Sequence, residues 1–297
     1  MPKSFLSDNE SLVKKASLLT LGAEKLASGM KNGNFKSLYK GHGIEVNGVR
    51  DYIRGDDVRS LDWNVTARMG KPFVKVFEEQ RELQTFLVVD SSDSMLLETG
   101  RKTKYEEVAE AAALVTLASE INGCPVGGVF FDGEIHFSSK PRSGRNQSML
   151  LLQHLDRLSE IKTKGSSLGT ALNGAGKLLK QRSLIFIFSD FRTGEWQKPL
   201  IALSQKHDII AVRVHDKYDD ELPSLGSVIF EDIESGIRMT LPTSSSKFKK
   251  QWNDYHEQKI ALWQEICQKH GIIPVILKTV DDPLYVLNNV FSKKIKG

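Results

Sequence analysis

The sequence of 297 residues is poor in cysteine and has no long apolar run. Its only cysteines, Cys124 and Cys267, lie in apolar or helical stretches without a metal-binding spacing such as Cys-x-x-Cys, which favours a reducing compartment. No stretch is apolar over the length that a bilayer requires, and the first ten residues lack the apolar core of a signal peptide. We therefore expect a cytoplasmic protein without stable membrane insertion.

The sequence also lacks a strong charge of one sign and the common phosphate-binding loops. The formal net charge is +4, and basic residues alternate with acidic ones except in the tail at 292–297, which argues against nucleic-acid binding. No Gly-x-Gly-x-x-Gly or Gly-x-x-x-x-Gly-Lys loop follows the strand predicted at 85–90, so we do not expect this chain to bind ATP. A Gly-x-Ser-x-Gly elbow is missing as well, which argues against a serine hydrolase.

What the sequence does contain is an alternation of strands and helices after residue 84. Short apolar runs predict strands, and longer segments with apolar residues at helical spacing predict helices. Because such alternation implies right-handed crossovers around one sheet, the expected fold class is α/β, with a doubly wound, mostly parallel, Rossmann-like sheet. The predicted strands span 85–90, 126–131, 134–138, 184–189, 209–214 and 272–277, the predicted helices span 105–122, 147–158, 168–181, 196–206 and 247–270, and a β-hairpin is predicted from 227–233 and 237–241.

The N-terminal part differs from this pattern. Apolar residues recur at steps of three and four between residues 10 and 30, which predicts an amphipathic helix despite Gly22 within it. The following segment, up to about residue 81, is rich in glycine and charge and is expected to be irregular. We therefore predict two parts: residues 1–84, with the N-terminal helix and the irregular segment packing on the main domain, and residues 85–297, which form the main domain with the hairpin insertion and a C-terminal helix.

A candidate metal site lies directly after the strand at 85–90. Asp90 ends this strand, and Ser92 and Ser94 follow it at alternate positions. Ligands of open α/β sheets bind just beyond the carboxyl ends of the strands, where these side chains fall. A few hard oxygen donors, partly neutral and partly anionic, suit a small divalent cation that keeps some of its waters, and Mg²⁺ is the natural candidate. The structural alternative is a Ser-rich turn that caps a helix.

The pattern Asp-x-Ser-x-Ser resembles the metal-ion-dependent adhesion site of von Willebrand factor type A domains. In that family a Thr or Ser in a glycine-containing turn and then an Asp arrive later in the chain. Here the turn at 165–172 places Ser166 at the threonine position, and Asp190 follows the strand at 183–189. The resemblance implies a von Willebrand factor A-like fold and a site for Mg²⁺ or another divalent cation, formed by Asp90, Ser92, Ser94, Ser166 and Asp190.

This sequence departs from that family's pattern at two positions. Only Gly165 precedes Ser166, where relatives often have two glycines, so Ser167 or Thr170 could take its place. Phe191 follows Asp190, where many relatives have glycine, which affects the rim of the site rather than the carboxylate.

A narrower resemblance rests on residues 50–63, here called the signature block. They read Arg-x-Tyr-x-x-Gly-Asp-Asp-x-Arg-x-x-Asp-Trp, a pattern that in the bacterial family of domain of unknown function 58 (DUF58) precedes the adhesion-type site. Members of that family are commonly encoded beside MoxR-type AAA+ ATPases, so the resemblance implies such a partner and a chaperone-like or cofactor-insertion role. Many relatives carry membrane-spanning helices before the block, and this sequence resembles a soluble short form.

The charged residues of the signature block favour a scaffold. Three arginines and four aspartates in and just after the block could form a lattice of ion pairs, with Trp63 anchoring the segment against the main domain. The alternatives are a second metal site at Asp56 and Asp57, or phosphate binding by the arginines. The lattice is predicted from Arg54, Arg59 and Arg68 with Asp51, Asp56, Asp57 and Asp62.

Taken together, these patterns predict a binding module rather than an enzyme. An open position on the bound cation would accept an Asp or Glu of the partner protein. The main alternative is a Mg²⁺-dependent phosphohydrolase with Asp90 as its nucleophile. Such enzymes have an Asp-x-Asp motif, however. Ser92 stands at the position of its second aspartate and cannot act as the acid that pairs with the nucleophile.

Overall fold

The computed structural model describes residues 22–24, 26–28, 30, 45–78, 84–96, 102–157, 165–220, 224–231 and 238–292. These residues fall into two compact units, one built from residues 22–30 and 84–292 and the other from residues 45–78. The sequence grouped the N-terminal helix with the irregular segment. In the structure, the described helical residues belong to the unit that contains the main sheet.

The larger unit is built on a six-stranded sheet with the order β10-β7-β6-β3-β4-β5. The first five strands in this order are parallel to their neighbours and β5 pairs antiparallel with β4, so the predicted α/β class with a mostly parallel sheet is confirmed. Strands β3 and β6 are buried almost throughout, which explains why both read as uninterrupted apolar runs. The strands are β3 (Gln84–Asp90), β4 (Val126–Phe131), β5 (Ile135–Arg142), β6 (Ser183–Ser189), β7 (Asp208–His215) and β10 (Ile273–Lys278).

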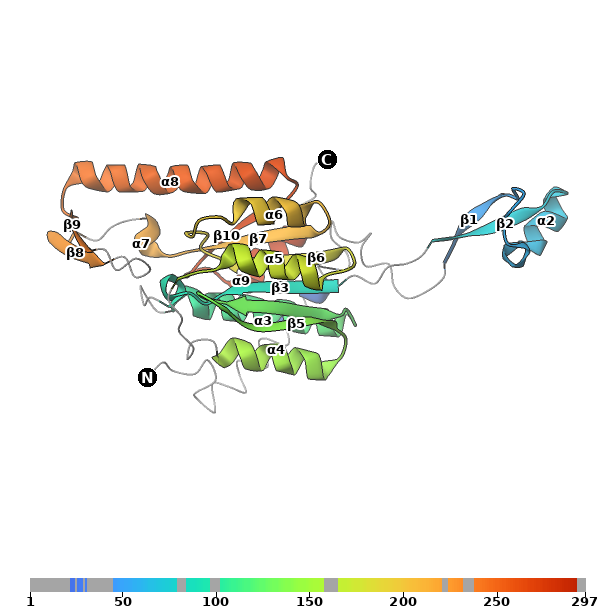
Figure 1. Ribbon diagram of the computed structural model, residues 1–297, viewed down its shortest axis with the longest axis horizontal. Helices are drawn as coiled ribbons and strands as arrows, with labels where there is room; N and C mark the ends of the chain where they lie inside the picture. Colours follow the sequence, from blue (N-terminus) through green and yellow to red (C-terminus); the bar gives the residue numbers. More distant parts are fainter. Residues whose placement is uncertain are drawn as a thin grey trace. The chain divides into compact units, whose positions relative to one another are not determined.

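Helices cover both faces of this sheet (Figure 1). On one face, α5, α6 and α8 bury a core with Phe86, Ile185 and Trp263 among its members. On the other face, α3 packs against α4 and α9. The helices are α3 (Lys104–Ile121), α4 (Arg145–Arg157), α5 (Leu168–Leu178), α6 (Gln197–Ser204), α7 (Lys217–Asp220), α8 (Ser246–Lys269) and α9 (Pro283–Ser292), with a 3-10 turn η3 (Asp93–Met95).

The predicted elements of this unit agree with the structure apart from their ends. The hairpin is present as β8 (Ser227–Glu231) and β9 (Arg238–Pro242). Helix α5 ends three residues earlier than predicted, because the backbone of Leu179 is extended. The side chain of Leu179 is buried where the chain turns towards β6. Between residues 10 and 30, only part of the predicted helix lies within the described residues.

The described part of the N-terminal helix packs into the larger unit. Ala23, Leu26 and Met30 are fully buried, and the Asn122 side chain at the end of α3 donates a hydrogen bond of 3.1 Å to the carbonyl of Ala27. Gly22 is helical at a close approach, since a Cβ added there would lie 3.0 Å from the Leu114 side chain. The glycine that weakened the helix prediction therefore makes room for α3.

The smaller unit is more regular than the sequence predicted. It contains an antiparallel pair, β1 (Glu45–Asp51) and β2 (Phe73–Glu78), with η2 (Val58–Ser60) and α2 (Trp63–Met69) between the strands. The expectation of an irregular segment was wrong here, because a register shift between Val46 and Gly48 and the frequent charges hide the alternation of the strands.

Within the signature block, the aspartates have separate structural roles. Asp56 accepts two hydrogen bonds of 2.7 Å from the Arg50 guanidinium, which lowers the pKa of Asp56 to about 2. Asp57 caps η2 and Asp62 caps α2 by accepting backbone N–H bonds. The ion-pair lattice was predicted to use Arg54, Arg59 and Arg68, whereas the bidentate pair of the block uses Arg50.

Candidate metal centre

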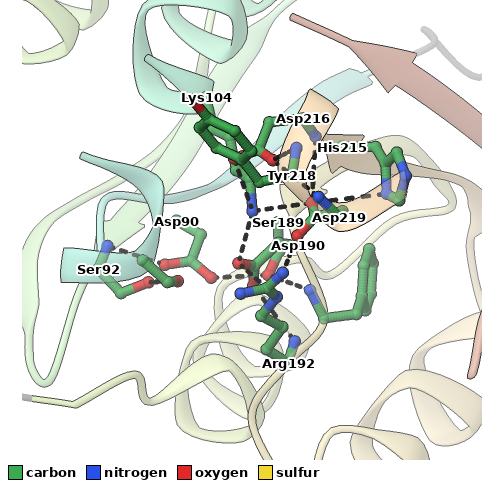
Figure 2. A network of polar contacts seen from close by, with 12 residues as sticks. Asp90, Ser92, Lys104, Ser189, Asp190, Arg192, His215, Asp216, Tyr218 and Asp219 are labelled. Atoms are coloured by element: carbon green, nitrogen blue, oxygen red, sulfur yellow. Dashed lines mark hydrogen bonds and ion pairs between the residues drawn. The ribbon is translucent and has the colours of Figure 1, made fainter. Parts of the chain in front are cut away.

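The candidate site lies at the carboxyl edge of the main sheet, where β3 and β6 are neighbours. Val89 pairs with Phe188 in the parallel register, so the chain reaches Asp90 and Ser189 at the same level of the sheet. Asp190 follows directly. Figure 2 shows Asp90, Ser189 and Asp190 close together in one polar network. The topology thus brings together two aspartates that are 100 positions apart in the sequence.

Asp90 is fully buried and is held by hydrogen bonds from three sides. Its Oδ1 accepts from the backbone N–H of Ser92 at 3.0 Å, and its Oδ2 accepts from the hydroxyls of Ser189 at 2.6 Å and Ser166 at 3.5 Å. Burial, followed by the nearby Asp190 carboxylate, raises the pKa of Asp90 to about 7. Burial and the neighbouring carboxylate therefore disfavour the ionised form of Asp90 in the absence of a bound cation.

The serines predicted as ligands lie around Asp90. The hydroxyls of Ser92 and Ser94 are 3.3 Å apart, and both side chains are buried. Neighbouring ligands of an octahedral Mg²⁺, with bonds of about 2.0–2.1 Å, lie about 3 Å apart. The separations of 3.3 Å between these hydroxyls and 3.5 Å between Ser166 Oγ and Asp90 Oδ2 are only slightly wider.

The structure also distinguishes Ser166 from its two alternatives. Ser167 donates through its backbone N–H at 2.7 Å and its hydroxyl at 3.1 Å to the carbonyl of Asp132, and Thr170 is exposed on α5. Ser166 is the one of the three that contacts Asp90. Ser167 instead positions the turn by tying it to the end of β4.

One carboxylate oxygen of Asp190 forms ion pairs but accepts no hydrogen bond from the residues that the structure describes. Its Oδ1 accepts from the backbone N–H of Arg192 at 3.2 Å, whereas its buried Oδ2 accepts no hydrogen bond from any residue that the structure describes. The Nζ of Lys104 and the Nε of Arg192 each lie 3.6 Å from this oxygen. A buried oxygen that accepts no hydrogen bond and lies next to a second acid is a feature that a bound cation would explain.

A network of buried ions adjoins Asp190, and the sequence did not reveal it. Lys104, at the start of α3, is 1% exposed, and its Nζ lies 3.8 Å from Asp216 and 3.0 Å from Asp219 (Figure 2). Burial lowers the pKa of Lys104. The only signal in the sequence is that Asp216 and Asp219 follow a third core strand, β7, at the same edge as Asp90 and Asp190.

Phe191 has a backbone conformation that favours glycine. Its φ is +53°, in the left-handed region that is costly for a side chain with a Cβ. Its N–H donates to the Ser189 hydroxyl at 3.0 Å, and its ring packs against Trp196 and Trp263 with centroids 5.4 Å away in each case. These contacts hold the turn that presents Asp190.

The donor set suits a small, hard cation. Within the described parts of the chain, no group of three or more His, Cys, Asp or Glu side chains is arranged to hold a metal. A site here would use two carboxylates and neutral hydroxyls, a composition that fits Mg²⁺ with retained waters better than zinc or copper. Asp90, Ser92, Ser94, Ser166 and Asp190 are the residues that could hold it.

A model of the family described as "Protein of unknown function DUF58" matches residues 48–261, from the signature block through the candidate site into α8. The chain belongs to the DUF58 family. The uncharacterized proteins Rv1480 of Mycobacterium tuberculosis and Mb1516 of Mycobacterium bovis are each 32% identical to this DUF58 protein over 232 residues, which cover 77% of this chain and 73% of theirs.

Two solved structures resemble this DUF58 protein more distantly. The conserved hypothetical protein BatB from Bacteroides thetaiotaomicron is 15% identical with a TM-score of 0.47, and an aerotolerance-related membrane protein from Bacteroides fragilis is 17% identical with a TM-score of 0.49. Each match covers 70% of this chain and 96% of the other. Similarity at this level carries no argument about function. Among the helices of the described residues, none combines the length and apolar character needed to cross a membrane.

Proposed function

We propose that this DUF58 protein is a non-enzymatic binding module of the von Willebrand factor A kind, which holds Mg²⁺ and uses it to bind a carboxylate of a partner protein. The observation that supports this most is the joint burial of Asp90 and Asp190 beside serine hydroxyls. Two buried carboxylates next to each other are costly unless a cation neutralises them. Lys104 and Arg192 offset part of this charge from 3.6 Å on the Asp190 side. Bound Mg²⁺ would supply the rest, together with a coordination position for one further oxygen.

Some residues of the site would bind the cation, and others would orient these ligands. The hydroxyls of Ser92, Ser94 and Ser166 serve as neutral ligands, and Asp90 and Asp190 bind directly or through water. Ser189 and the N–H of Ser92 orient Asp90 through their hydrogen bonds. Because the three hydroxyls cancel none of the cation's charge, and a carboxylate that binds through water cancels less of it than one bound directly, an Asp or Glu of the partner binds more favourably than a neutral group.

We further propose that the partner is a MoxR-type AAA+ ATPase and that the pair works in chaperone-like assembly. Support for this comes from membership of the DUF58 family together with the complete signature block. The alternative of a phosphohydrolase lacks support, since Ser92 stands where the second acid of an Asp-x-Asp enzyme is needed.

The proposal predicts that Asp90→Ala weakens binding of a purified MoxR-type ATPase by about 100-fold or more. A loss of this size is expected when a buried carboxylate that binds the cation is removed. Biolayer interferometry with the immobilised chain, in Mg²⁺ and again in EDTA, measures this. The wild-type signal should disappear in EDTA, and the variant should behave in Mg²⁺ as the wild type does in EDTA.

Asp208→Ala is the matched control, because Asp208 begins β7 at the opposite edge of the sheet and pairs with a largely exposed Arg182. This variant should bind as the wild type does. Binding of the ATPase that survives both EDTA and Asp90→Ala would contradict the proposed role of the metal.

A further inference from the structure

Asp219 is fixed by the short helix that carries it. Asp216 accepts hydrogen bonds from the N–H groups of Tyr218 at 2.8 Å and Asp219 at 3.0 Å, and the Asp219 carboxylate accepts one from the N–H of Asp216 at 3.1 Å. This reciprocal arrangement is a capping box at the start of α7. These backbone hydrogen bonds hold the Asp219 carboxylate at the carboxyl edge of the sheet.

Both cations beside Asp190 are bound more closely by Asp219. Lys104 Nζ lies 3.0 Å from Asp219 Oδ2 but 3.6 Å from Asp190 Oδ2. Arg192 forms a short contact from Nη2 to Asp219 Oδ1, while its Nε stays 3.6 Å from Asp190 Oδ2. Each oxygen of Asp219 therefore holds one cation (Figure 2).

This arrangement explains why Asp190 Oδ2 accepts no hydrogen bond from the described residues although two cations are close to it. A movement of well under 1 Å by either cation would convert a 3.6 Å contact into a hydrogen bond. Lys104 or Arg192 would then occupy the oxygen that a metal needs, and would add positive charge against the incoming cation.

We propose that Asp219 is a positioning residue that holds Lys104 and Arg192 back from Asp190, and so keeps the second carboxylate of the site available to a divalent cation. The inference rests on the proposed function, since it concerns the same metal site. It assigns Asp219 an effect on metal affinity although Asp219 is not a ligand.

Isothermal titration calorimetry of the full chain with MgCl₂ tests this directly. Asp219→Asn keeps the side-chain shape and the oxygen that caps α7 but loses the charge that holds the cations. We expect its affinity for Mg²⁺ to be about tenfold or more below that of the wild type, because both cations can then close on Asp190.

Asp216→Asn is the matched control for the loss of one buried negative charge. Asp216 is 5% exposed, as is Asp219, and it lies farther from Lys104, at 3.8 Å. Asn caps a helix as well as Asp does, so α7 is retained, and we expect Mg²⁺ affinity within about threefold of the wild type. Adding Arg192→Gln to Asp219→Asn restores the net charge, removes one competitor and should recover most of the lost affinity.

A second variant covers the case in which Asp219→Asn does not fold. The Arg192 side chain is 37% exposed, so Arg192→Gln is tolerated more easily. It removes one competing cation and should bind Mg²⁺ about threefold more tightly than the wild type. Arg182→Gln, at the opposite edge of the sheet, should leave the affinity unchanged.

The outcomes separate this inference from the proposed function. The role of Asp219 would be overturned if Asp219→Asn and Asp216→Asn lost equal affinity for Mg²⁺, or if Arg192→Gln bound Mg²⁺ no more tightly than the wild type. Neither result would contradict the metal site itself. A wild-type chain that binds no Mg²⁺ would overturn both.

Discussion

Lys104→Met is expected to lower the free energy of unfolding by about 3–5 kcal/mol in the absence of metal, the range typical of breaking a buried ion pair by removing one partner. Lys104 is 1% exposed and lies within 4 Å of three carboxylates, those of Asp190, Asp216 and Asp219. Without it, Asp190 and Asp219 lose one of their two closest cations and retain Arg192. Methionine keeps the length of the side chain, so the loss reflects charge rather than packing. Urea unfolding in EDTA measures it.

Arg182→Met provides the comparison for this prediction. Arg182 also forms an ion pair with an aspartate, through a 2.7 Å contact to Asp208, but its side chain is 61% exposed. Exposed pairs contribute about 0–1 kcal/mol, so the stability of this variant should stay close to that of the wild type. A loss in Lys104→Met no larger than in Arg182→Met would show that the buried network does not depend on Lys104.

Asp90→Asn, unlike Lys104→Met, is expected to raise the free energy of unfolding of the metal-free protein. The pKa of Asp90 is raised to about 7 in the folded protein, mainly by burial and then by Asp190, whereas an unfolded aspartate titrates near its ordinary value. As the pH rises from about 4, the unfolded chain therefore releases its proton first. The contribution of protonated Asp90 to stability is fully present below the unfolded pKa of about 4. It is lost as the pH rises through the folded pKa of about 7.

The amide cannot ionise, so Asp90→Asn removes this penalty. It should stabilise the metal-free protein by about 1–2 kcal/mol at pH 8, after allowance for the hydrogen bonds from Ser189 and Ser166, which the amide NH2 group cannot accept. The gain should be smaller at about pH 5, and Mg²⁺ should stabilise the wild type but not the variant. Urea unfolding at both pH values, with EDTA and with Mg²⁺, tests each part. A variant less stable than the wild type at pH 8 in EDTA would contradict the prediction.

Much of the candidate site was predictable because the order of the strands and their apolar pattern determine where Asp90 and Asp190 lie. Asp90 and Asp190 each end an apolar run, and parallel strands bring such ends to one edge of the sheet. Ser92 and Ser94 follow Asp90 closely enough for local geometry to place them. The main sheet and the helices α3, α4, α5, α6 and α8 followed from the same periodicity, whereas α7 and α9 were not predicted.

The ionic surroundings of the site were not predictable in this way. A lysine in the first turn of a helix usually faces solvent, and nothing next to Lys104 in the sequence indicates that three acids from the ends of β6 and β7 surround it. Asp219 lies in a four-residue helix, α7, which is too short for periodicity to reveal. The strands β1 and β2 were missed because a bulge breaks the alternation on which their recognition depends.

The most direct test of the metal site is anomalous diffraction from crystals of the full chain grown with Mn²⁺, which has the oxygen preference of Mg²⁺ and a measurable anomalous signal. We predict a single strong peak at the carboxyl edge of the sheet, within about 2.0–2.3 Å of the hydroxyls of Ser92 and Ser94 and close to Asp90 and Asp190. A well-ordered site without such a peak, with Lys104 or Arg192 bonded to Asp190 instead, would contradict the account.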